Sequence, residues 1–234
     1  PPVLMVASRW DWGFSEMLTM FGWKAALAVF INALGAALLL RRELTGLPPG
    51  AAVKDPTRVP LPLVLAHLLI LAGIVAFAHH PAMFMGLLLF FLGIAHAYQH
   101  HQDRLILREG LLVAFFLAGL VVLGGKQQWW LQPLLMNMSN DQVFYGAALL
   151  TAFTDNAALT YLGSLVEGLP ESFKYALVAG AVTGGGLTII ANAPNPAGIA
   201  ILKDKFEDQT VHPLGLLLAA VPPTIVAALA FRLL

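Results

Sequence analysis

Long stretches without a charged residue are the feature that most constrains this chain. No Asp, Glu, Lys or Arg occurs over 59–102, and further gaps cover 110–125, 175–202 and 209–231. A membrane-spanning helix needs about 20 mostly apolar residues, so the longest gap holds two helices, with a turn at His79-His80-Pro81. Only 11% of residues are charged and 59% are hydrophobic. We therefore predict an all-α polytopic membrane protein.

The hydrophobic pattern predicts about six or seven segments. We expect a cytoplasmic loop near 41–60, because it and the 99–109 loop are rich in Lys and Arg. Residues 1–125 then form membrane helices, and residues 126–234 carry two broken segments. The sequence leaves open whether 126–139 form an interfacial turn or a re-entrant piece. The expected helices cover 22–40, 61–79, 82–98, 110–125, 140–166 with a break, 172–192 with a break, and 211–232.

Composition excludes several classes of protein. With no cysteine, the chain has no disulfide and no Cys-ligated metal. Its 13 basic and 13 acidic residues cancel, which argues against a nucleic-acid partner and leaves the lipid bilayer as the expected surroundings. No Ser/His/Asp elbow or phosphate-binding Gly-rich loop is present, so we expect neither an enzyme nor a cofactor.

One acid interrupts an otherwise uncharged segment. Residues 142–166 contain a single charged residue, Asp155. An ionised acid at mid-membrane costs about 2.5–3.5 kcal/mol, so such residues face a cavity, bind an ion or carry a proton. Thr154 and Asn156 flank it, and Asp and Asn compete for backbone hydrogen bonds, so we predict a break near 151–160 with an ion- or proton-binding group. The alternative is structural: Asp155 pairs with a neighbouring helix or caps the second half-helix.

A second interruption is predicted at residues 183–198. Three consecutive glycines each cost about 1 kcal/mol against Ala in a helix, and two prolines follow that cannot continue a helix interior. Irregular backbone at membrane depth is tolerated only where it is buried in protein or lines a wet cavity. Close helix packing is the alternative; it explains the glycines but not the Asn-Ala-Pro-Asn-Pro run. The predicted backbone site consists of Gly184, Gly185 and Gly186.

Neutral oxygens accompany this second break. Asn and Thr side chains beside free carbonyls are an environment for a hard cation. Two interrupted segments, one holding an acid, are also typical of a secondary-transporter binding site. The predicted ligands in this segment are Thr188, Asn192 and Asn195.

The two interruptions carry a family resemblance. Thr151-Ala-Phe-Thr-Asp-Asn156 resembles the Ser/Thr-x-x-x-Asp-Asn element of the ion transporter superfamily, which includes arsenite permeases and NhaD-type sodium/proton antiporters. Gly184-Gly-Gly-Leu-Thr-Ile-Ile-Ala-Asn-Ala-Pro-Asn195 resembles the companion Gly-Gly-x-x-Thr-x-Ile-Gly-x-x-x-Asn element, with Ala191 in place of Gly. With Ala197-Gly-Ile-Ala-Ile-Leu202, the sequence is most similar to bacterial sodium/proton antiporters of that superfamily. The motifs cover about residues 140–202.

The resemblance implies an inverted-repeat transporter of the cell inner membrane, often dimeric, with its site at the repeat interface. Asp155 and Asn156 fall on the Asp-Asn pair, and Thr188 and Asn195 on the polar positions of the Gly-rich element. Only one pair of broken segments is visible, and the chain lacks an initiator Met. We therefore expect the C-terminal part of a transporter, with an N-terminal half missing.

Antiport of Na⁺ and H⁺ is the expected function, because an acid that holds either ion exchanges them by competition. The first alternative is an oxyanion or carboxylate permease. The central segments hold no Lys or Arg, which favours a cation, although half-helix N-termini bind anions unaided.

The second alternative is an intramembrane metal-binding protein or enzyme that uses histidines. His96 and His100 are spaced i,i+4 like a zinc pair, with His101 adjacent, but only Asp103 is a nearby acid. We expect these histidines at the membrane interface. His67 lies inside a predicted helix, where we expect it to hydrogen-bond to a neighbouring helix.

Overall fold

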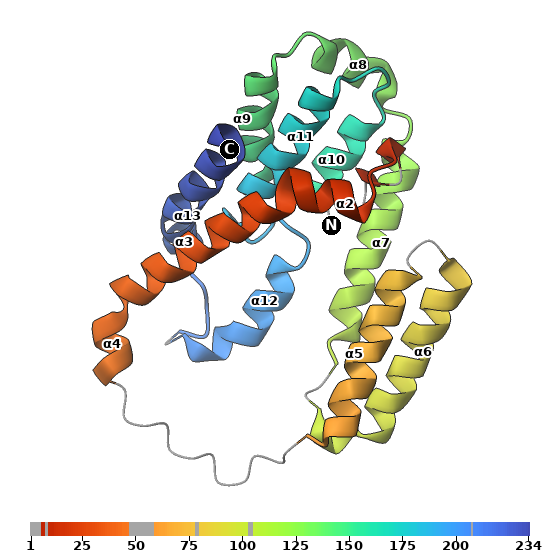
Figure 1. Ribbon diagram of the computed structural model, residues 1–234, viewed down its shortest axis with the longest axis vertical. Coiled ribbons are helices and arrows are strands. Elements are labelled where there is room, and N and C mark those ends of the chain that lie inside the picture. The colour runs from red at the N-terminus through yellow and green to blue at the C-terminus, as the bar shows by residue number, and fades with distance from the viewer. Residues whose placement is uncertain (1–5, 8, 47–58, 78–79, 103–104, 207) are drawn as a thin grey trace. The chain divides into compact units, whose positions relative to one another are not determined.

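The computed structural model describes residues 6–7, 9–46, 59–77, 80–102, 105–206 and 208–234 (Figure 1). No strand occurs among them, which confirms the all-α class. Most of the predicted 41–60 loop, together with His79 and Asp103, lies outside the described residues. The helices are α2 (Phe14–Met17), α3 (Trp23–Leu39), α4 (Arg41–Gly46), α5 (Leu61–Ala76), α6 (Pro81–Ala97), α7 (Leu107–Gly124), α8 (Gln128–Met136), α9 (Asn140–Thr151), α10 (Asn156–Ser164), α11 (Glu171–Gly184), α12 (Asn195–Leu202) and α13 (Pro213–Leu233), with η1 (Leu18–Gly22), η2 (Gln99–His101) and η3 (Lys203–Lys205) as short π or 3₁₀ pieces.

The chain divides into two compact units, a smaller one at Arg42–Ile106 and a larger one formed by 1–41 and 107–234. The smaller unit is a hairpin of α5 and α6. Pro81, which the sequence prediction placed in the turn before a helix at 82–98, is instead the first residue of α6, because proline fits the first helical position without losing a hydrogen bond. The functional division at residue 125 stays a prediction.

His67 corrects one expectation. Its Nδ1 lies 2.7 Å from the carbonyl oxygen of Leu63, within its own helix. It meets the neighbouring helix through its ring, which packs edge-on against Phe91. The predicted hydrogen bond to a neighbouring helix is therefore wrong for Nδ1, because the carbonyl oxygen four residues earlier in the same helix is its partner.

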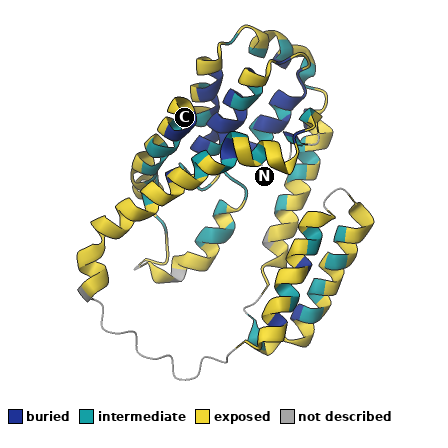
Figure 2. Ribbon diagram, viewed as in Figure 1, coloured by how far each residue is buried: buried dark blue, intermediate teal, exposed yellow. Residues whose placement is uncertain are grey.

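The core of the larger unit is centred on α9 and α11, where the buried residues gather in Figure 2. Phe144 of α9 and Val178 of α11 are fully buried. A Cβ atom added at Gly180 would overlap the carbonyl oxygen of Phe144, and one at Gly184 would overlap that of Ala148. These glycines therefore let two helix backbones touch, so the close-packing interpretation is correct for Gly184.

Within the described ranges, two helices are long and apolar enough to cross a membrane: Phe14–Leu39 with 26 residues and Pro213–Leu233 with 21. The first begins eight residues before the predicted start, because η1 continues the helix as a π turn. Segments 110–124 and 128–136 pass the same test together but bend by 84° at their junction. The total of six or seven spans stays a prediction.

The longer first helix changes the setting of Lys24, which lies inside it instead of near its end. The Lys24 ammonium donates to the Tyr175 hydroxyl oxygen at 2.8 Å, and that hydroxyl donates to the carbonyl oxygen of Phe231 at 2.8 Å. Arg232 pairs with Asp141 at the start of α9. These contacts tie α3, α11, α13 and α9 into one body.

Candidate functional site

The first break separates α9 from α10 at residues 152–155. Asp155 has an extended backbone (φ −73°, ψ 136°) and is the N-cap of α10. Its Oδ1 accepts from the backbone N–H groups of Ala157 at 2.8 Å and Ala158 at 3.1 Å. These are donors that a helix start leaves unpaired, and a carboxylate there is also favoured by the helix dipole. The capping interpretation is therefore correct for this oxygen.

The second carboxylate oxygen of Asp155 has a different setting. Only 9% of the residue is exposed, and Oδ2 is buried without a hydrogen-bond partner among the described residues. Because capping occupies only Oδ1, Oδ2 stays available for an ion or a proton.

The second break lies between α11 and α12, at residues 185–194. It closes on itself through Asn195, whose Nδ2 donates to the carbonyl oxygens of Gly185 and Thr188, both at 2.9 Å. The helix resumes at Asn195 because Pro196 suits a first-turn position. The Asn195 amide nitrogen thus shapes this loop.

Two hydrogen bonds join the breaks. The backbone N–H of Asn156 donates to the carbonyl oxygen of Ala191 at 3.1 Å. The Thr188 hydroxyl donates to the carbonyl oxygen of Ala152 at 2.8 Å. Residues 36 positions apart in the sequence are therefore in contact, and the two breaks meet at one junction.

Three side-chain oxygens at this junction are buried and have no hydrogen-bond partner within the described chain. An unpaired buried polar group costs about 1–3 kcal/mol, and the described chain supplies no partner for these atoms. Asn156 is 2% exposed. The oxygens are Asp155 Oδ2, Asn156 Oδ1 and Asn192 Oδ1.

Gly185 holds the Asn156 amide in place. A Cβ atom at Gly185 would lie 2.8 Å from Asn156 Nδ2, closer than any real contact. A larger residue at 185 would therefore require the Asn156 amide to shift from its place between the two breaks. The second of the three predicted glycines thus lies against a predicted site residue, whereas Gly184 packs α11 on α9; the role of Gly185 as a backbone site stays a prediction.

Two predicted site residues lie apart from this junction. Thr154 is exposed, and its hydroxyl donates to the carbonyl oxygen of Leu150, near the end of α9, at 2.9 Å. Gly186 is exposed, with open space where a Cβ would be. Their roles as ligand and backbone site stay predictions.

Sequence reasoning missed the backbone acceptors Ala152 and Ala191. Ala191 is fully buried. The sequence held one hint at Ala191: the related motif has Gly at this position, and a small residue at such a position marks a backbone segment with close neighbours. Ala152 carries no comparable signal.

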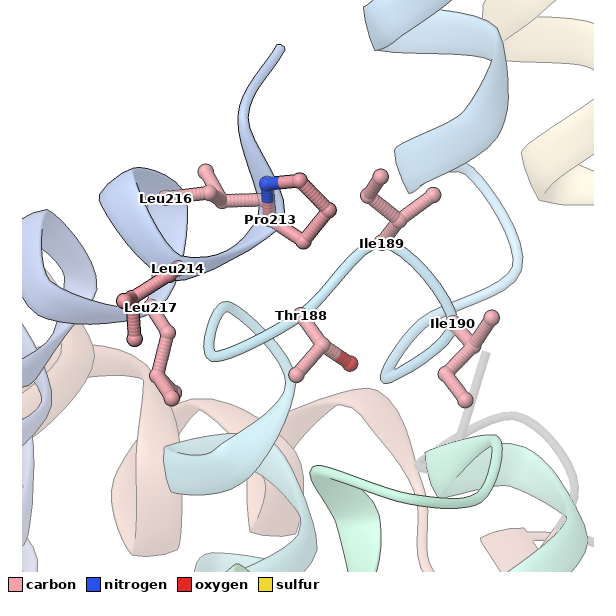
Figure 3. A pocket seen from close by; sticks show the side chains of 7 residues that line it. All are labelled: Thr188, Ile189, Ile190, Pro213, Leu214, Leu216 and Leu217. Carbon is pink, nitrogen blue, oxygen red and sulfur yellow. The ribbon is translucent and has the colours of Figure 1, made fainter.

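An apolar cavity of about 420 Å³ lies next to the second break (Figure 3). Its walls come from 188–190 of the loop and from the start of α13. Thr188 is its only polar residue, and the hydroxyl is bonded to Ala152. The cavity therefore lacks the oxygen ligands that a hard cation requires.

The histidines form no metal cluster in the part of the chain that the structure describes, where no three His, Asp or Glu side chains gather. His100 and His101 are neighbours, with ring centroids 4.2 Å apart. Asp103, the acid nearest to them in sequence, lies outside the described residues.

Comparison with known proteins gives one match. A family model described as "Putative Na+/H+ antiporter" matches residues 1–234. No curated protein matches the chain, and neither does any solved structure.

Proposed function

We propose, from the premise that this chain belongs to that Na⁺/H⁺ antiporter family, that Asp155 is the group on which Na⁺ and H⁺ compete. The family and the apolar helices make it a membrane transport protein. The titrating carboxylate, several passes across the cell inner membrane and the ligand set are parts of the proposal.

The main support for this proposal is that the two carboxylate oxygens of Asp155 have different surroundings. Oδ1 is held by two backbone N–H groups, and Oδ2 is buried and free. A junction that holds a buried carboxylate oxygen and two buried, unpartnered amide oxygens, those of Asn156 and Asn192, suits a hard monovalent cation. One negative charge neutralises one such cation.

Exchange follows from competition at one atom. With Na⁺ on Oδ2, the carboxylate is ionised and its charge is paired. A proton that arrives on Oδ2 makes the acid neutral, which removes the attraction for Na⁺ and releases it. The hydrogen bonds to Ala157 and Ala158 stay on Oδ1 in both states, so α10 keeps its start.

The anion-permease alternative needs free N–H groups at a half-helix N-terminus. In α10 the first three N–H groups are already bonded: Asn156 to Ala191, and Ala157 and Ala158 to Asp155. An anion would also meet the Asp155 carboxylate. These contacts favour a cation.

Na⁺-dependent proton flux in membrane vesicles tests the proposal. In vesicles with wild-type protein, an imposed Na⁺ gradient should drive protons across the membrane in the direction opposite to Na⁺. Vesicles with Asp155→Asn should show no such proton movement. Unchanged exchange in the variant would refute the role of Asp155. Absence of cation-coupled flux in the wild type would turn the assignment toward anion transport.

A further inference from the structure

The chain turns sharply between α7 and α8. Segments 110–124 and 128–136 meet at an angle of 84°, and α8 holds no charged residue (Figure 1). A short apolar helix of this kind either enters the membrane as a re-entrant piece or lies along its surface. The neighbours of α8 in the larger unit distinguish these two placements.

The end of α13 fixes a level for the start of α9. α13 is long and apolar enough to cross a membrane, and its 21 residues rise about 31 Å, which matches a hydrocarbon core of about 30 Å. Its end would then mark one surface of the bilayer. Arg232, at that end, pairs with Asp141 in the first turn of α9. The start of α9 therefore lies at the same surface.

Both ends of α8 lie near this kind of polar surface. Lys126 is exposed two residues before α8, and an ammonium is costly inside hydrocarbon. At the other end, the link to α9 consists of residues 137–139 and reaches at most about 14 Å when fully extended. Asn137 turns instead (φ −94°, ψ 1°), so the link is too short to return from the membrane interior. A helix with both ends near one surface runs along it.

The side chains of α8 divide into two faces. Leu131 is buried in the core of the larger unit, and Leu135, one turn later, packs against that core. Trp129 is 79% exposed and Met136 is 53% exposed. Seven residues are close to two helical turns, so these two exposed side chains share one face.

The exposed face suits the headgroup layer of a phospholipid bilayer. Tryptophan is enriched there, because its ring is apolar and its indole N–H needs a polar partner. Pro133 adds a second polar requirement, since it has no N–H to pair with the carbonyl oxygen of Trp129. Hydrocarbon would satisfy neither group, whereas water and lipid ester groups satisfy both.

A helix of the 42–106 unit is a poorer cover for this face. Helices that pack within a membrane meet through small residues, which let their backbones approach. The exposed face of α8 presents large side chains instead, those of Trp129, Trp130, Leu134 and Met136.

We propose that α8 lies in the plane of the membrane surface, with Trp129 and Met136 in the headgroup layer of the phospholipids. Lys126 then faces the phosphate groups of the same layer, which stabilise its charge. The placement rests on α13 crossing the bilayer and does not involve Asp155.

Two labels on one face measure the tilt of α8. Because the chain has no cysteine, Trp129→Cys and Met136→Cys each carry a single nitroxide label, in the full protein in phospholipid vesicles. Collision rates with oxygen, which concentrates in lipid, and with a water-soluble nickel chelate give the depth of each label. Ile225→Cys, whose wild-type residue is 54% exposed near the middle of α13, is the reference for the hydrocarbon core.

We expect the labels at 129 and 136 to lie at the same depth, shallower than the label at 225, and to be reached by both quenchers. A helix along the membrane normal would instead separate the two depths by about 10 Å, and that result would overturn the inference. Nickel access without oxygen access at both positions would show bulk water. Low access to both quenchers would show a protein cover, such as the 42–106 unit. Either result would also overturn the inference.

The reference label tests the premise. A label at 225 that oxygen does not reach would show that α13 does not lie in lipid, and the inference would be refuted with it. Trp130→Cys and Asn137→Cys, again seven residues apart, repeat the comparison if Trp129→Cys does not fold. Label depth does not depend on Na⁺/H⁺ exchange, so loss of exchange bears on the proposed function alone.

Discussion

The backbone N–H of Asn156 donates to the carbonyl oxygen of Ala191 at 3.1 Å, and so fastens the start of α10 to the loop between α11 and α12. Neither group belongs to a regular helix hydrogen bond, since each helix is interrupted at this point. A backbone donor freed by one interruption is therefore paired with a backbone acceptor freed by the other. A change in the position of one loop must reach the other through this bond.

Asp155→Asn and Asp155→Ala separate capping from ion binding. Asn is as good a helix N-cap as Asp, so the free energy of unfolding of Asp155→Asn should lie within about 0.5 kcal/mol of the wild-type value. That of Asp155→Ala should be about 1 kcal/mol lower. Both should abolish Na⁺-dependent proton flux, because neither can ionise. Thermal unfolding in detergent and vesicle flux give the two readouts. Flux that survives in Asp155→Asn would contradict the assignment.

Thr188→Val should weaken the link between the breaks. Valine keeps the side-chain shape but leaves the buried carbonyl of Ala152 without its donor, at a cost of about 1–3 kcal/mol. We expect a lower unfolding free energy and a higher apparent KM for Na⁺. Thr224→Val is the matched control, because the Thr224 hydroxyl bonds only to Ala220 within α13. Equal effects of the two substitutions would show that the link between breaks has no special role.

Gly184→Ala should destabilise the fold. The added methyl group meets the Ala148 backbone, which cannot move aside without separating α9 from α11, and overpacking of this kind costs about 1–3 kcal/mol. Gly186→Ala, where nothing lies within 4 Å, should change the unfolding free energy by about 0.5 kcal/mol or less. A denaturation series compares them, and similar stabilities would contradict the packing at Gly184.

Glu171 should give the chain a small acid-dependent stability. A hydrogen bond from Lys174, helped by one from Trp12, lowers the pKa of this exposed carboxyl below its ordinary 4.5. A depressed pKa in the folded state stabilises the fold above pH 4.5, and this contribution disappears as the pH falls through the lower folded value. Solvent screening keeps the effect small. Unfolding midpoints across this pH range should vary less in Glu171→Gln than in the wild type; identical profiles would count against the contact.

Much of this architecture can be predicted from the sequence, because a lipid bilayer requires helices with long uncharged stretches. Charge gaps locate helices to within a few residues, as at α5 and α6. The lone acid at 155 and the glycine and proline run after Thr183 mark where helices must break. The start of the first helix was missed, since Leu18–Gly22 continues as a π turn that no residue pattern announces.

The contacts between segments are beyond sequence reasoning. Asp155 could have been read as a cap or as a ligand, and only the three-dimensional arrangement shows that one oxygen caps while the other is free. The three glycines have the same sequence signature, yet their surroundings differ: Gly184 lies against the Ala148 backbone, Gly185 lies against the Asn156 amide, and nothing lies within 4 Å of a Cβ position at Gly186. Their difference arises from which helix packs against them, and spacing along one chain does not contain that information.

The glycine contacts between α9 and α11 bear on how such a site can move. Two helices that meet backbone to backbone at Gly180 and Gly184 cannot slide without driving carbonyl groups into side chains. We therefore expect α9 and α11 to behave as one rigid pair, and each of the two helices ends at a break. If the junction of the two breaks is the transport site, we expect α9 and α11 to move as a pair, so that access changes when this pair turns against the rest of the protein and not when the two helices separate.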